Sequence, residues 1–85
     1  MTKYTIVIDR SGYKSEHKPV VAKDIDDLRK KVLKSYATVL KDGSNFIDVY
    51  TGKKGAYSRS GVLHGKTWTS RNGFNYVDPK TGRLM

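Results

Sequence analysis

The chain has 85 residues, contains no cysteine, and carries 17 lysines and arginines against 8 aspartates and glutamates, a formal net charge of +9. This length allows one domain with one modest core, and the absence of cysteine excludes disulfides, thiolate nucleophiles and cysteine-based zinc sites. A positive charge of this size favours polyanionic partners, namely nucleic acid or an acidic protein surface.

The N-terminal segment predicts a β-hairpin. Residues 4–9 are rich in β-branched and aromatic side chains, Ser11-Gly12 supplies a two-residue turn, and a second strand covers residues 13–21. In this register the face of residues 5, 7 and 9 meets charged partners, and we expect that face to be solvated. Pro19 predicts that the second strand lies at an edge or bends. The opposite face supplies the core residues Tyr4, Ile6 and Ile8.

The best-defined element is an amphipathic helix. Asp24 is a suitable N-cap, and the acidic residues that follow it favour a helix N-terminus. Apolar side chains recur at helical spacing from Ile25, and Asp42-Gly43 ends the helix after about Lys41. Arg29 projects into the apolar arc, with its stem over the core and its head group towards solvent. The opposite face forms a secondary basic surface of Lys30, Lys31, Lys34 and Lys41.

Further β segments follow the helix. Residues 46–51 and 56–59 predict two strands around a turn at Gly52–Gly55. The turn has the GxxG spacing of the KH-domain loop, but its position between strands favours an ordinary hairpin turn. Residues 62–64 lie between two glycines, and we interpret them as a short or irregular strand.

The strongest turn signal in the second half is Asn72-Gly73. This dipeptide predicts the type I′ tip of a hairpin that joins residues 66–70 to residues 74–77. In that register Trp68 and Val77 face the core. The side chains left exposed are Arg71, Phe74 and Tyr76.

The order of these elements predicts an α+β domain that spans residues 1–85. We expect a small antiparallel sheet with one amphipathic helix packed across one face, because this arrangement buries the apolar side of both. The hairpin followed by the helix start Asp24-Ile25-Asp26-Asp27-Leu28 resembles the opening of ubiquitin-like β-grasp domains. The resemblance implies a β-grasp-like fold and assigns no function to any residue.

The segment from Val49 to Val77 carries the clearest functional signal. It contains no aspartate or glutamate, yet it holds five basic and five aromatic residues. Cations that meet phosphates, interleaved with rings that stack on bases, are typical of single-strand binding with little sequence preference. The predicted nucleic-acid-binding residues are Lys53, Lys54, Tyr57, Arg59, Lys66, Arg71, Phe74 and Tyr76.

Catalysis is not indicated. His17 and His64 are isolated, and no metal-ligand or nucleophile motif is present, so we expect no enzyme activity, no cofactor and no metal. Two function classes remain open: a non-catalytic DNA- or RNA-binding domain, and a protein-interaction module. The second class includes adaptors and inhibitors such as the small accessory proteins of mobile elements. Because no leader-like or membrane-spanning run is present, we expect a cytoplasmic protein.

Overall fold

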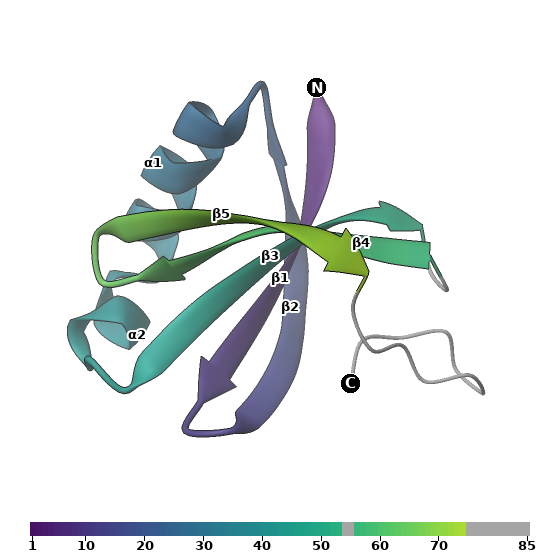
Figure 1. Ribbon diagram of the computed structural model, residues 1–85. Coiled ribbons are helices and arrows are strands. Elements are labelled where there is room, and N and C mark those ends of the chain that lie inside the picture. Colours follow the sequence, from purple (N-terminus) through teal and green to yellow (C-terminus); the bar gives the residue numbers. More distant parts are fainter. Residues whose placement is uncertain (54–55, 75–85) are drawn as a thin grey trace.

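A strongly twisted antiparallel sheet carries two short helices on one of its faces (Figure 1). The computed structural model describes residues 1–53 and 56–74. The five strands follow the spatial order β2-β1-β3-β4-β5, and each neighbouring pair is antiparallel. The elements are β1 (Thr2–Arg10), β2 (Tyr13–Ala22), α1 (Ile25–Ser35), α2 (Ala37–Lys41), β3 (Asn45–Lys53), β4 (Ala56–His64) and β5 (Thr67–Phe74).

The first hairpin forms at the predicted turn. Ser11 and Gly12 both have positive φ angles, +53° and +93°, the backbone that a two-residue type I′ turn requires. The Asp9 carboxylate accepts a hydrogen bond from the Gly12 amide at 2.8 Å and holds the turn closed. β2 is an edge strand, and its register against β1 shifts near Pro19, which confirms the prediction made from that proline.

The N-terminus of α1 is capped as predicted. The Asp24 carboxylate accepts a hydrogen bond from the Asp27 amide at 2.8 Å, and the Asp27 carboxylate accepts one from the Lys23 amide at 3.0 Å. The hydrogen bond from Lys23, followed by the contact with Lys31, lowers the pKa of Asp27 below its usual value. These reciprocal bonds satisfy amides that the first helical turn would otherwise leave without partners.

The prediction of one continuous helix to Lys41 is wrong. α1 ends at Ser35, and Tyr36 leaves the helical conformation with φ −118° and ψ 27° before α2 begins. The Tyr36 ring makes an edge contact with His17 of β2 at 5.8 Å between centroids, and Leu40 of α2 is buried in the core. The break accommodates both contacts with the sheet, which helical periodicity alone does not predict.

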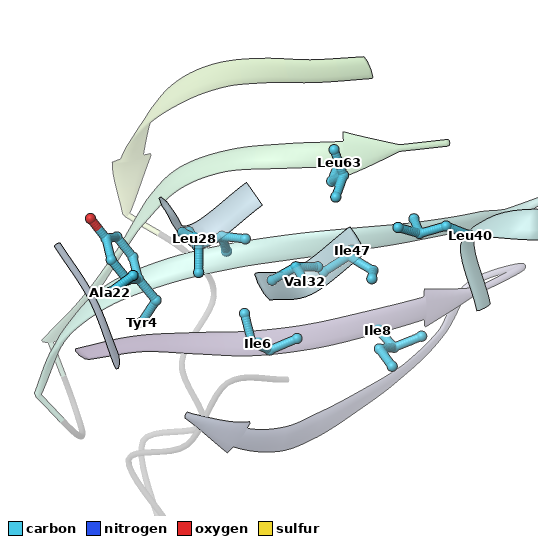
Figure 2. Packing of buried hydrophobic residues seen from close by; sticks show 10 residues of the cluster. Tyr4, Ile6, Ile8, Ala22, Leu28, Val32, Leu40, Ile47 and Leu63 are labelled. Carbon is cyan, nitrogen blue, oxygen red and sulfur yellow. The ribbon is translucent and has the colours of Figure 1, made fainter. Parts of the chain in front are cut away.

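The main core lies between the helices and the sheet (Figure 2). Tyr4, Ile6 and Ile8 point into it as predicted, and each is less than 7 % exposed. Full burial of an apolar side chain of this kind contributes about 1.5–3 kcal/mol. The other members of this core are Ala22, Leu28, Val32, Leu40, Ile47, Val49 and Leu63.

The opposite face of the sheet is also partly buried, which corrects the expectation of a solvated face. Val7 is 2 % exposed and packs with Tyr50 and Tyr57 in a second apolar cluster, and Thr5 is buried too. The reason is that β1 is an inner strand with β2 on one side and β3 on the other. Large tyrosine side chains from β3 and β4 therefore lie against Val7.

The hairpin predicted at Asn72-Gly73 is wrong. β5 runs through both residues, and the turn from β4 lies at Gly65-Lys66, where Gly65 has a φ of +59°. Residues 62–64 therefore belong to the long strand β4, which contains Gly61.

Packing of the only tryptophan explains this register. Trp68 pairs with Leu63 and packs against the main core, as its predicted core-facing orientation requires. Its ring lies over Gly61, where any Cβ atom would collide with the indole. The glycine at 61 thus leaves the room that the β4–β5 pairing needs. Val77, which was predicted to face the core with Trp68, lies outside the described residues.

The structure is α+β with a small antiparallel sheet, as predicted. The hairpin and helix that resemble the opening of β-grasp domains are present, and the strands after them continue as an antiparallel meander from β3 to β5. Within residues 1–53 and 56–74, no helix combines the length and the apolar character that crossing a membrane requires.

Candidate functional site

A hollow on the sheet face opposite the helices collects two of the predicted site residues. Arg59 of β4 and Arg71 of β5 border it together with Lys14 of β2, and its volume is about 340 Å³. The Arg59 guanidinium lies 5.7 Å from the centre of the Tyr50 ring and donates a hydrogen bond to its hydroxyl at 3.4 Å. Tyr50 thereby positions a cation at the sheet surface. The remaining lining residues are Asp9, Phe46, Asp48 and Val62.

Asp48 lies in the lining of this hollow and is only 5 % exposed. Burial raises the pKa of its carboxyl above the usual value, because lost hydration outweighs the attraction of Arg59 and of the other nearby cations. Asp9 is held by the hydrogen bond from the Gly12 amide. Asp48 is thus buried below the surface of the hollow, and the Asp9 carboxylate is hydrogen-bonded within its own turn.

A second hollow, of about 400 Å³, lies near the tip of the β1–β2 hairpin on the side of the sheet that carries the helices, because its lining residues Ser15 and His17 pair with the core-facing Ile8 and Ile6. Lys14 borders both hollows, so the two meet around the β2 edge. Arg10 and Tyr13 border the second hollow, and the Tyr13 side chain is 85 % exposed. Phe46 is 39 % exposed and stacks on His64 with ring centroids 4.4 Å apart. We name the two hollows together the sheet-tip surface, which passes around the β2 edge from one side of the sheet to the other; its residues are Arg10, Tyr13, Lys14, Phe46, Arg59 and Arg71.

Lys66 does not join Arg59 and Arg71. It lies at the β4–β5 turn and borders an apolar hollow of about 260 Å³ with Lys41 of α2. A neighbouring hollow of about 360 Å³ is bordered by Arg29 and Lys30, and the two hollows share Leu33. We name this area the helix groove; its residues are Asp26, Arg29, Lys30, Leu33, Ala37, Leu40, Lys41, Gly65 and Lys66.

The secondary basic surface is therefore only partly as predicted. Lys30 and Lys41 border the helix groove, and Lys34 is exposed on α1. Lys31 instead has a structural role, because its ammonium donates to the Val21 carbonyl at 2.8 Å and pairs with the Asp27 carboxylate at 3.3 Å. These contacts connect α1 to β2, so the Lys31 ammonium is already bound within the protein.

Tyr57 is not available for stacking, which corrects its predicted role. Its side chain is only 9 % exposed and belongs to the cluster with Val7 and Tyr50. Alternation along β4 places it on the same face as Arg59, over the central strands, where an aromatic ring is covered instead of exposed.

Other predicted contacts fall where the structure gives no side-chain description. Lys53 ends β3 opposite Ala56, and Phe74 ends β5 opposite Ser58, but only their backbones are described. Lys54 and Tyr76 lie outside the described residues.

Sequence reasoning missed the aromatic part of the sheet-tip surface. Tyr13 directly follows the Ser11-Gly12 turn and has Arg10 and Lys14 as neighbours. An aromatic residue next to two cations at a hairpin turn could have been recognised from the sequence as an exposed binding residue. Phe46 had no such signal, because its exposure results from its position at the end of β3.

Comparisons with protein-family models, with curated proteins and with solved structures find no match to this chain. In the part of the chain that the structure describes, no group of three or more histidine or acidic side chains could hold a metal ion.

Proposed function

We propose that the protein is a non-catalytic domain that binds single-stranded nucleic acid through the sheet-tip surface, with little base specificity. One observation carries the proposal. Exposed rings lie beside cations on both sides of the β2 edge: Tyr13 with Arg10 and Lys14 on the helix side, and Phe46 with Arg59 and Arg71 on the opposite side, where the two acids are buried or hydrogen-bonded.

Each part of the surface has a separate role in this proposal. Arg10, Lys14 and Arg71 contact phosphates, and the exposed face of Tyr13 stacks on a base. Base–aromatic stacking contributes about 1–3 kcal/mol per base and tolerates any sequence, because every base has a π-face. The other predicted contacts, Lys53, Lys54, Phe74 and Tyr76, stay predictions.

The salt dependence of binding follows from the number of phosphates neutralised. If about four cations contact a single strand, the binding constant falls with a log–log slope near −2.8, or about 50-fold between about 50 and 200 mM salt. A neutral or apolar recognition mode has no such slope. The measurement is fluorescence anisotropy of a labelled oligo-dT of about twelve nucleotides, which covers one typical binding site.

Variants locate the interface. Arg10→Glu/Arg71→Glu reverses two exposed charges of the sheet-tip surface, and Lys3→Glu/Lys18→Glu is the matched control, with the same change in net charge at exposed positions elsewhere. Tyr13→Ala should weaken binding between about 5- and 150-fold, the equivalent of one lost stacking contact. Equal losses in both double variants, or no binding at about 50 mM salt, would contradict the proposal.

A further inference from the structure

The two edges of the sheet differ in how they are protected. The β2 edge carries Pro19, alternating charges and a register shift, which are the devices that prevent other strands from pairing with a sheet edge. The β5 edge contains no proline or acid from Thr67 to Phe74, and Arg71 is its one charged residue. Within the described residues, no strand pairs with the outer side of β5.

The hairpin register shows which backbone groups this edge presents. Gly65-Lys66 is a two-residue turn closed by the His64–Thr67 pair, and the closing pair of such a turn is a hydrogen-bonded one. Hydrogen-bonded and non-hydrogen-bonded pairs alternate along an antiparallel ladder. The amides and carbonyls of Trp68 and Ser70 therefore point away from β4, towards the outer edge.

The apolar end of the helix groove adjoins this edge at the β4–β5 turn. Its hollow of about 260 Å³ has an apolar lining from Leu33, Ala37 and Leu40, with room for one large apolar side chain. Lys41 and Lys66 border it from α2 and from the turn. Neither lysine has an acidic partner among the described residues.

The charge around the groove is mostly positive. Lys30 is exposed on the same side of α1, and Asp26, the one acid among the groove residues, pairs with Arg29 at 3.9 Å. A partner segment that brings carboxylates to these lysines complements the groove. A nucleic acid fits it less well, since it neither supplies strand hydrogen bonds to β5 nor fills the apolar hollow with a side chain.

We infer that an acidic, extended segment of a partner protein docks here by adding a strand to the outer edge of β5. Its backbone bonds to Trp68 and Ser70, one apolar side chain enters the hollow at Leu33, and its carboxylates meet Lys41 and Lys66. Strand addition takes affinity from main-chain hydrogen bonds and specificity from pockets for alternate side chains. The groove and the sheet-tip surface are separate, so this inference does not depend on nucleic-acid binding.

The probe is a fluorescein-labelled eight-residue peptide that alternates valine with glutamate. Its matched controls replace glutamate with lysine, or place proline at the centre of the acidic peptide, which removes a strand donor. We expect binding of the acidic peptide only. Equal binding of the proline-containing peptide would overturn strand addition, and no binding of the acidic peptide would overturn the site.

Protein variants test the location. Lys41→Glu/Lys66→Glu should weaken the acidic peptide at least about tenfold, whereas Lys3→Glu/Lys18→Glu should change binding less than about threefold. Ser70→Pro should abolish binding while Ser70→Ala retains it, because only the first removes an outward amide. If Ser70→Pro fails to fold, Ala37→Phe, which fills the hollow from an exposed position, should weaken binding by a similar factor.

The same variants separate this inference from the proposed function. Tyr13→Ala should leave peptide binding unchanged, and Lys41→Glu/Lys66→Glu should affect oligo-dT no more than the control pair does. Displacement of the acidic peptide by unlabelled oligo-dT would assign the groove to nucleic acid and overturn the inference. Failure of oligo-dT binding alone would leave the peptide result standing.

Discussion

Substitution of Gly61 by alanine tests the packing that sets the β4–β5 register. A Cβ atom at this position would lie 2.8 Å from Trp68 Cε2 and 2.7 Å from the Thr69 carbonyl oxygen, and nearer still to Trp68 Cζ2. Carbon atoms in contact are ordinarily about 3.5–4.0 Å apart. The indole ring must therefore move, although it packs against the main core.

The expected loss follows from the cost of overpacking. Added atoms in a packed region destabilise by about 1–3 kcal/mol, so we expect Gly61→Ala to lose about 2 kcal/mol of unfolding free energy. For a domain of this size each 1 kcal/mol lowers Tm by about 4–8 °C, so Tm should fall by roughly 8–16 °C. Urea unfolding followed by fluorescence reports directly, because Trp68 is the only tryptophan.

Gly43→Ala is the matched control. A Cβ atom at residue 43 meets nothing within 4 Å, and loss of glycine at a compatible backbone position stabilises by about 0.4–1 kcal/mol. Combining Gly61→Ala with Trp68→Leu should cost about 1 kcal/mol less than the sum of the two single changes. A Gly61→Ala protein with wild-type stability and unchanged emission would refute the proposed packing.

Three further predictions concern capping, the core and pH. Asp24→Ala should lose about 1 kcal/mol in urea unfolding, and a loss no larger than that of the exposed control Asp26→Ala would argue against the cap. Leu28→Ala should lose about 2–5 kcal/mol because Leu28 is 0 % exposed; similar losses for Leu28→Ala and Val21→Ala, at a residue 46 % exposed, would contradict its core position. The raised pKa of Asp48 means that the folded state favours its protonated form, so its contribution to stability is present at acidic pH and lost as pH rises through the raised value. Asp48→Asn should therefore gain stability relative to wild type as pH increases above about 4, and a constant difference across the pH series would count against this burial effect.

Local signals were sufficient for the first turn and for the start of the helix. The turn at Ser11-Gly12 and the cap at Asp24 depend on residues within a few positions of one another, so sequence patterns predicted them. The break at Tyr36 depends on contacts with β2 and the core. No neighbouring residue in the sequence indicates those contacts.

The second half shows where local signals fail. Asn72-Gly73 is a favourable turn dipeptide, yet the chain turns at Gly65-Lys66, because Trp68 then packs against the core with its ring over Gly61. Packing of the partly buried Trp68 ring against the core contributes free energy in proportion to the apolar area removed from water, which the turn dipeptide alone does not reflect. Tertiary packing therefore determined the register.

The candidate site was predicted only in part for the same reason. Arg59 and Arg71 share a hollow, as alternation along two strands allows. Tyr57 is buried over Val7, and Lys66 lies in the helix groove. Which face an aromatic side chain occupies, and what covers that face, depends on strand order, which the sequence alone does not provide.

An NMR titration with oligo-dT gives the most direct test of nucleic-acid binding at the sheet-tip surface. Amide shifts of the ¹⁵N-labelled protein should move at residues 10–14, at Phe46 and at Arg71, and should diminish as salt rises from about 50 to 200 mM. Residues of the helix groove, such as Leu33 and Lys41, should stay unchanged. Shifts confined to the groove, or no shifts at the lower salt concentration, would contradict the proposed function.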